Sequence, residues 1–186
     1  MATRALIIGK DKNGNYRYGQ SFINGYQNTA WLQKHMSNPD EVEKFLIKLT
    51  EGGEDGDGHG IHSLFYEDSN ETDTYDFQGH TITVNRPDYN KPFVKWDECS
   101  YNSGIAKSLE EMLQLLQPEK DLGLIHLKNF DFPEYISYWT GEKWVGTGDK
   151  DCLEYKDAEL IDDSECRKGE FWEDSAYLFQ EIIKNN

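Results

Sequence analysis

The sequence lacks any run of eighteen apolar residues, which argues against a helix that crosses a membrane. Its opening, MATRALIIGKDKNG, also lacks the apolar core and small-residue cleavage site of a secretory signal. We therefore expect a cytoplasmic protein that has no contact with membranes.

Cysteine is scarce. The three cysteines, Cys99, Cys152 and Cys166, form no Cys-x-x-Cys pair, and an odd number of this kind is typical of reduced thiols. A zinc site built from Cys99, His126 or the later cysteines would have no recognised spacing.

Catalytic motifs are missing as well. The chain has no nucleophile elbow, Walker loop, dinucleotide fingerprint or zincin helix. The five histidines (His35, His59, His62, His80 and His126) follow no pattern that brings them together. We predict a protein that is not an enzyme and that uses no cofactor.

Basic residues are few, and the chain carries nineteen Lys and Arg against thirty-five Asp and Glu, for a net charge of −16. Residues 1–50 hold seven basic and four acidic residues, whereas residues 51–100 hold three and twelve, and residues 151–186 hold four and eleven. Such a field repels nucleic acid and attracts basic protein surfaces. The alternative is that the acidity serves solubility alone.

Aromatic residues are plentiful, at 13% of the chain, which indicates a folded protein and not an acidic disordered one. A length of 186 residues predicts a single domain, 1–186.

The N-terminal third gives clear local signals. An Asn13-Gly14 turn between strands 4–10 and 16–22 predicts a hairpin. Asn38 and Pro39 then mark the start of a helix over 39–50. The apolar face of this helix consists of Val42, Phe45, Leu46 and Leu49.

The middle of the chain predicts a meander of short strands that includes 62–66 and 81–84, broken by Pro87 and Pro92. A helix over 107–116 follows, capped by Ser108 with Glu111 and ended by Pro118. Strands at 124–127 and 135–146, the second a hairpin turning at Gly141, and a closing helix with Tyr177, Leu178 and Ile182 on one face complete an α+β fold. The expected core is Leu6, Ile8, Trp31, Phe45, Leu49, Leu113, Leu116, Ile125 and Trp144.

Two segments are predicted as loops. The stretch EGGEDGDGHGIH (51–62) contains five glycines, which predict a mobile acidic loop over 51–60. A calcium site on Asp55, Asp57 and His59 would need Glu at the twelfth position, where Tyr66 stands, so we expect no metal. Residues 149–172 are predicted as a charged, turn-rich insertion.

The ends of the chain resemble a family. MATRALIIGKDKNGNYRYGQSFINGY followed by NPDEVEKFLIKLTEGGED, together with YISYWTGEKWVG, is similar to an uncharacterised family of small phage-encoded proteins. Relatives carry His-Trp-Asp before Gly-Tyr, where this chain has Phe22-Ile23-Asn24. The resemblance implies a phage accessory protein of the host cytoplasm, and phages use small acidic proteins of this kind to disable host defence nucleases.

The preferred hypothesis is therefore an acidic, nucleic-acid-mimicking inhibitor of a host defence nuclease, similar to anti-CRISPR proteins, which binds a basic surface of its partner and not nucleic acid itself. The alternatives are a sponge for a nucleotide second messenger, held by Arg4, Lys10, Lys12 and Arg17, and a metal-dependent enzyme that uses Asp55, Asp57, His59 and His62. The predicted acidic surface consists of Asp55, Asp57, Asp68, Glu71, Asp73, Asp76, Asp162, Asp163 and Glu165, with Tyr75, Tyr89 and Trp172 as aromatic anchors. The sequence leaves the oligomeric state open.

Overall fold

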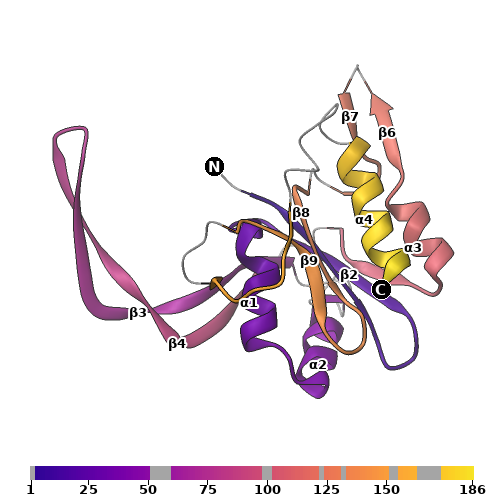
Figure 1. The fold of residues 1–186 in the computed structure, drawn as a ribbon, viewed down its shortest axis with the longest axis horizontal. Coiled ribbons are helices and arrows are strands. Elements are labelled where there is room, and N and C mark those ends of the chain that lie inside the picture. Colours follow the sequence, from indigo (N-terminus) through magenta and orange to yellow (C-terminus); the bar gives the residue numbers. More distant parts are fainter. Residues whose placement is uncertain are drawn as a thin grey trace.

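A computed structural model describes residues 3–50, 60–97, 102–121, 124–130, 133–150, 155–162 and 173–186 (Figure 1). Its elements are, in chain order, β1 (Ala5–Lys10), β2 (Tyr16–Ser21), η1 (Gly25–Gln27), α1 (Asn28–His35), α2 (Pro39–Thr50), β3 (Gly60–Phe77), β4 (His80–Asp97), β5 (Gly104–Ala106), α3 (Leu109–Leu115), β6 (Pro118–Asp121), β7 (Leu124–Leu127), β8 (Tyr135–Trp139), β9 (Trp144–Gly148), β10 (Ile161–Asp162) and α4 (Glu173–Asn185).

The main sheet has β1 at its centre. The strand order is β10-β9-β8-β1-β2-β3-β4, and β5 also pairs with β2. β1 runs antiparallel to β2 and parallel to β8. Its first five residues are all buried, which fits a strand with a neighbour on each side and a helical layer on each face. This arrangement, in which the described residues form a large sheet packed by α-helices, confirms the predicted α+β class.

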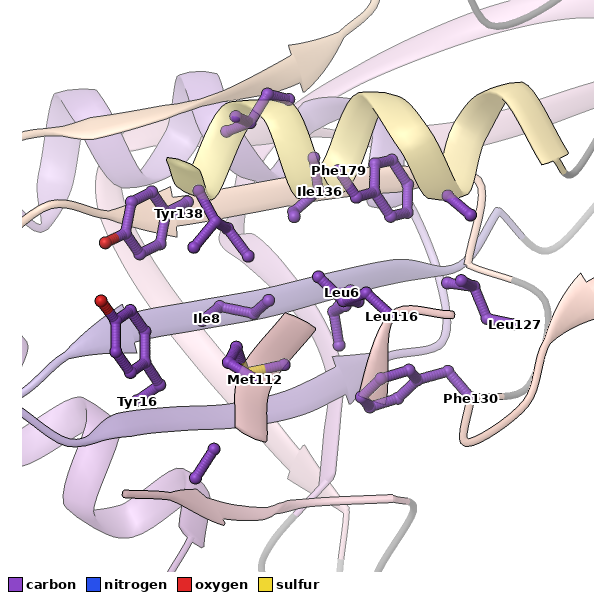
Figure 2. Close-up of a cluster of buried hydrophobic side chains, with 14 residues drawn as sticks. Leu6, Ile8, Tyr16, Met112, Leu116, Leu127, Phe130, Ile136, Tyr138 and Phe179 are labelled. Carbon is purple, nitrogen blue, oxygen red and sulfur yellow. The ribbon is translucent and has the colours of Figure 1, made fainter. Parts of the chain in front are cut away.

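Alternation along β1 divides the core into two layers. Leu6 and Ile8 point to the face that α3 and α4 cover, where they meet Met112 and Phe179 (Figure 2). Ile7 points to the other face, where α1 and α2 contribute the other buried side chains. The second layer includes Trp31, Leu32, Phe45, Leu46 and Leu49, so both faces of the sheet are covered.

The predicted helix starts are confirmed. The Asn38 side chain accepts a hydrogen bond from the backbone N–H of Asp40 at 2.9 Å, and Pro39 is the first residue of α2. At α3, Ser108 accepts from the N–H of Glu111, and the Glu111 carboxylate accepts from the N–H of Lys107. All four residues of the predicted α2 face are buried.

Gly146 of β9 lets α1 lie close to the sheet. A side chain here would collide with the carbonyl oxygen of Ile136 and the hydroxyl of Thr29. The Thr29 hydroxyl lies 2.7 Å from that of Ser137 and 3.0 Å from the carbonyl oxygen of Thr147. Buried polar groups need such partners, so these contacts fix α1 on β8 and β9.

Several predictions about the middle of the chain are wrong. The strands expected at 62–66 and 81–84 belong to one long hairpin, β3–β4, and not to a meander. β4 continues through Pro87 and Pro92, because an edge strand tolerates a residue that cannot donate to the ladder. Residues 124–127 pair with β6 in a separate two-stranded sheet, and Pro118 begins that β6.

Seven of the nine expected core residues are buried, namely Leu6, Ile8, Trp31, Phe45, Leu49, Leu116 and Trp144. Leu113 is only half-buried, and Met112 is buried instead. Tyr177 is exposed, because α4 turns Ala176, Phe179, Ile182 and Ile183 to the sheet. The side chain of Ile125, residues 51–59, the three cysteines and residues 151–154 and 163–172 lie outside the described part of the chain.

Candidate functional site

The β3–β4 hairpin, called the arm from here on (residues 60–97), extends as a two-stranded ribbon from the other described residues, which we call the body (Figure 1). Only its root joins the main sheet, where Ser21 of β2 pairs with Ile61. The tip is a two-residue turn in which Gln78 and Gly79 have φ values of 51° and 81°. Two positive φ values are typical of the type I′ turn, which closes hairpins with the right-handed twist of β-strands.

The arm bends where its pairing is irregular. Tyr66 pairs with Pro92, Asp68 with Pro87 and Thr72 with Asn85, so the two strands have unequal numbers of residues between these pairs. Such bulges bend a ribbon and increase its twist. Beyond the bend, the arm turns upward in the view of Figure 1. We call residues 72–85 the distal arm.

The distal arm has two chemically different faces. Tyr75 pairs with Ile82 and Phe77 with His80, and directly opposed residues share a face. Val84 lies opposite Asp73 on the same face, so Tyr75, Phe77, Ile82 and Val84 form the apolar face. The opposite face, called the threonine face, consists of Thr72, Thr74, Thr81 and Thr83 with Asp76 and Asn85.

The predicted acidic residues of the arm are exposed, but two of them are paired. Arg86 donates to Asp73 at 2.5 Å and to Glu71 at 3.3 Å. The hydrogen bond from Arg86 lowers the pKa of Asp73 below its ordinary value. Asp76 accepts from the Thr81 hydroxyl at 3.0 Å, and Asp68 lies at the bend. Two carboxylates share one guanidinium, so Glu71, Asp73 and Arg86 together keep a net negative charge.

The two described aromatic candidates lie in different settings. Tyr75 is 49% exposed on the apolar face. Tyr89 lies at the bend and packs edge-on against Tyr66, with ring centroids 4.9 Å apart. Asp55, Asp57, Asp163, Glu165 and Trp172 lie outside the described residues, and Asp162 is placed by its backbone alone, in β10.

The root of the arm is fixed to the body by a chain of polar contacts. The Tyr66 hydroxyl lies 2.9 Å from His35 Nε2 of α1 and 2.8 Å from the hydroxyl of Tyr155. Trp31 of α1 donates its indole N–H to the carbonyl of Phe65. Burial, and to a smaller extent the charge of Lys34, lowers the pKa of His35. His35 thus helps to hold the arm at its root.

Two of the residues expected for a nucleotide sponge are paired with carboxylates of this chain. Arg17 Nε donates to Asp11 at 3.0 Å, and Lys12 donates to Asp40 at 2.6 Å. Asp11 is buried and accepts from the backbone N–H groups of Asn13 and Asn15, which makes it the organiser of the β1–β2 turn.

Of the residues expected for a metal-dependent enzyme, Asp55, Asp57 and His59 lie outside the described residues. His62 Nδ1 lies 3.0 Å from the Ser63 hydroxyl. Within the described ranges, no three His, Cys, Asp or Glu side chains are grouped closely enough to hold a metal ion. No helix in these ranges has the length and apolar content needed to cross a membrane.

The surface pockets lined by described residues include two on the body. One, of about 310 Å³, lies between α1 and the Tyr155 segment and includes Lys34 and Lys156. The other, of about 370 Å³, lies between β2, β5 and α3 and includes Tyr18 and Glu111. In the first pocket, Gln33 donates to the backbone carbonyls of Trp144 and Glu159, and the Lys34 ammonium lies over the Tyr155 ring.

Sequence reasoning missed three members of the apolar face: Phe77, Ile82 and Val84. Their signal was present as alternation at 75, 77, 82 and 84 around a two-residue turn. In the short meander strands that the sequence predicts, this shared face cannot be recognised, because it depends on the register of β3 with β4. Comparisons of the chain with models of protein families, with characterised proteins and with solved structures find no match.

Proposed function

We propose that this chain is an acidic, stoichiometric inhibitor that binds the basic, nucleic-acid-binding surface of a host defence nuclease in the cytoplasm, with a CRISPR effector as the expected target. The observation that carries the proposal is the arm, whose distal part leaves large apolar side chains exposed. Isolated two-stranded hairpins gain little stability in water. An exposed hairpin of this length therefore points to a role in binding.

The charge of the arm supports this partner class. Residues 67–91 carry six carboxylates (Glu67, Asp68, Glu71, Asp73, Asp76 and Asp88) and two cations (Arg86 and Lys91). Lys91 lies 3.8 Å from Glu67 and 3.6 Å from Asp88. Even so, the carboxylates of this segment outnumber its two cations. Surfaces that bind nucleic acid are basic and attract such a ribbon at low to physiological salt.

The test removes the arm beyond its root. An Asn-Gly turn would replace residues 67–91 and join Tyr66 to Pro92, which already face each other across the ladder. We expect the shortened protein to keep the thermal midpoint of the body and to lose inhibition of a purified, guide-loaded CRISPR nuclease that the wild type inhibits.

A charge-matched control separates the arm from bulk acidity. The replacement removes a net charge of −4, and Glu110, Glu119, Glu142 and Glu159 are exposed carboxylates of the body. Changing these four to Gln removes the same charge and should leave inhibition intact. Undiminished inhibition by the shortened protein would contradict the proposal, as would a wild type that inhibits no member of a nuclease panel.

A further inference from the structure

The apolar face of the distal arm is uncovered. Tyr75 is 49% exposed, Phe77 57% and Val84 41%, and the register places all three on the same side of one short ribbon. Large apolar side chains that gather on one exposed face mark interaction sites in soluble proteins. Across the ribbon, the threonine face carries hydroxyl groups instead, so the two sides of the same strands are chemically distinct.

The size of the face argues against a stable contact between two arms. Stable protein interfaces bury about 800 Å² on each partner. Three half-exposed side chains provide only a fraction of this area. The occupant must therefore be a larger surface that also covers other parts of the arm, such as a groove that receives the ribbon.

Charge argues against a second copy and for a cationic occupant. Another copy would bring its own net charge of −16 and place carboxylates against carboxylates. At the end of the apolar face nearest the bend, Glu71 and Asp73 share Arg86, so these three side chains keep a net negative charge. The rings of Tyr75 and Phe77 further along this face can stack with guanidinium groups.

We infer that the apolar face is the anchor by which the arm binds a basic groove of the partner nuclease, an inference that rests on the proposed function. The carboxylates steer the encounter, whereas the apolar side chains hold the complex once it has formed. Steering charges act mainly on the association rate, and desolvated anchors act mainly on the dissociation rate.

The test compares matched changes on the two faces. Phe77→Thr with Val84→Thr removes two of the three exposed side chains of the apolar face and replaces them with a β-branched residue suited to strands. Thr74→Ser with Thr83→Ser makes two changes on the same two strands, on the threonine face. Thermal unfolding should show that both double variants fold, because all four positions are exposed.

Binding is measured by interferometry against a purified, guide-loaded CRISPR nuclease that the wild type inhibits. We expect the Phe77→Thr/Val84→Thr variant to bind at least tenfold more weakly, through faster dissociation, with the association rate within twofold of wild type. The Thr74→Ser/Thr83→Ser variant should stay within twofold in affinity. Affinity of the apolar-face variant within twofold of wild type overturns the inference.

Two further outcomes are distinguishable. If inhibition is lost when residues 67–91 are replaced but survives Phe77→Thr/Val84→Thr, the proposed function stands and this inference fails. If the wild type inhibits no nuclease, both fail. Sedimentation of the wild type alone should show a monomer. A dimer that Phe77→Thr/Val84→Thr disperses overturns the inference by assigning the face to a second copy.

Discussion

The strands of the body and of the distal arm both alternate their side chains between two faces, but those of the body are largely buried and those of the distal arm are largely exposed. In β1 of the body, alternating side chains are buried on both faces, because α3 and α4 cover one side and α1 and α2 the other. In the distal arm, the same alternation leaves aromatic and aliphatic side chains exposed on one face and threonines on the other. The exposed apolar side chains of the distal arm therefore contribute little to folding, since no layer packs against them, whereas Ile61 and Leu64 at the root of the arm belong to the core.

The largest difference between the body and the distal arm is expected for the same substitution, Phe→Ala, made in each. Phe45 is buried among Trp96 and Trp144, whereas Phe77 is mostly exposed. Phe45→Ala should lower the free energy of unfolding by about 3–5 kcal/mol, as for buried Phe in general. Phe77→Ala should stay within about 0.5 kcal/mol of wild type. Urea unfolding measures both, and equal losses would show that Phe77 belongs to the core.

A smaller effect concerns the root of the arm, where His35 meets Tyr66. Burial lowers the pKa of His35 from its ordinary value of 6.5, so the unfolded chain takes up this proton at a higher pH than the folded one. The contribution of neutral His35 to the free energy of unfolding is therefore fully present above pH 6.5. It is lost as the pH falls from 6.5 through the lower pKa of His35 in the folded state.

His35→Gln keeps a polar partner for Tyr66 but removes the titrating group. Urea unfolding of wild type and variant at pH 7.5 and 5.5 should show a smaller decrease for the variant. Other groups titrate alike in both proteins, so the difference between the two decreases isolates His35. Equal decreases would show that His35 does not link the root of the arm to pH.

The smallest expected effect on stability comes from the charges of the arm. Glu71→Lys with Asp73→Lys places two cations beside Arg86, on side chains that are at least half exposed. We expect the free energy of unfolding to change by no more than about 0.5 kcal/mol. Association with the nuclease should slow, and its dependence on salt should weaken. An unchanged association rate would show that these acidic residues serve solubility and do not steer binding.

Local signals in the sequence predicted much of the body. The Asn13-Gly14 turn, the Asn38 and Ser108 caps and the Gly141 turn each act over a few residues, and all four hold in the structure. The apolar spacing of α2 identified its buried face for the same reason. Such features depend on neighbours in the chain and need no knowledge of the fold.

Long-range pairing was not accessible in this way. Pro87 and Pro92 signal a break, yet an edge strand accommodates both. The 124–127 segment has the apolar character of a strand, but nothing local shows that β6 is its partner and not the main sheet. The same limit applied to the candidate site, which depends on the pairing of two strands. Tyr75 and the exposed carboxylates were identified by residue type, whereas the apolar face required the register of β3 with β4.

The central position of β1 has a consequence for how the chain folds during synthesis. β1 and β2 can pair as soon as both have left the ribosome, but the other edge of β1 pairs in parallel with β8, where Ala5 meets Tyr135. Until the chain has been made as far as Tyr135, an apolar edge stays open, and an open edge of this kind is prone to pair with other nascent chains. Slow translation before residue 135 should therefore lower the yield of folded protein, and a chaperone that shields β1 should restore it.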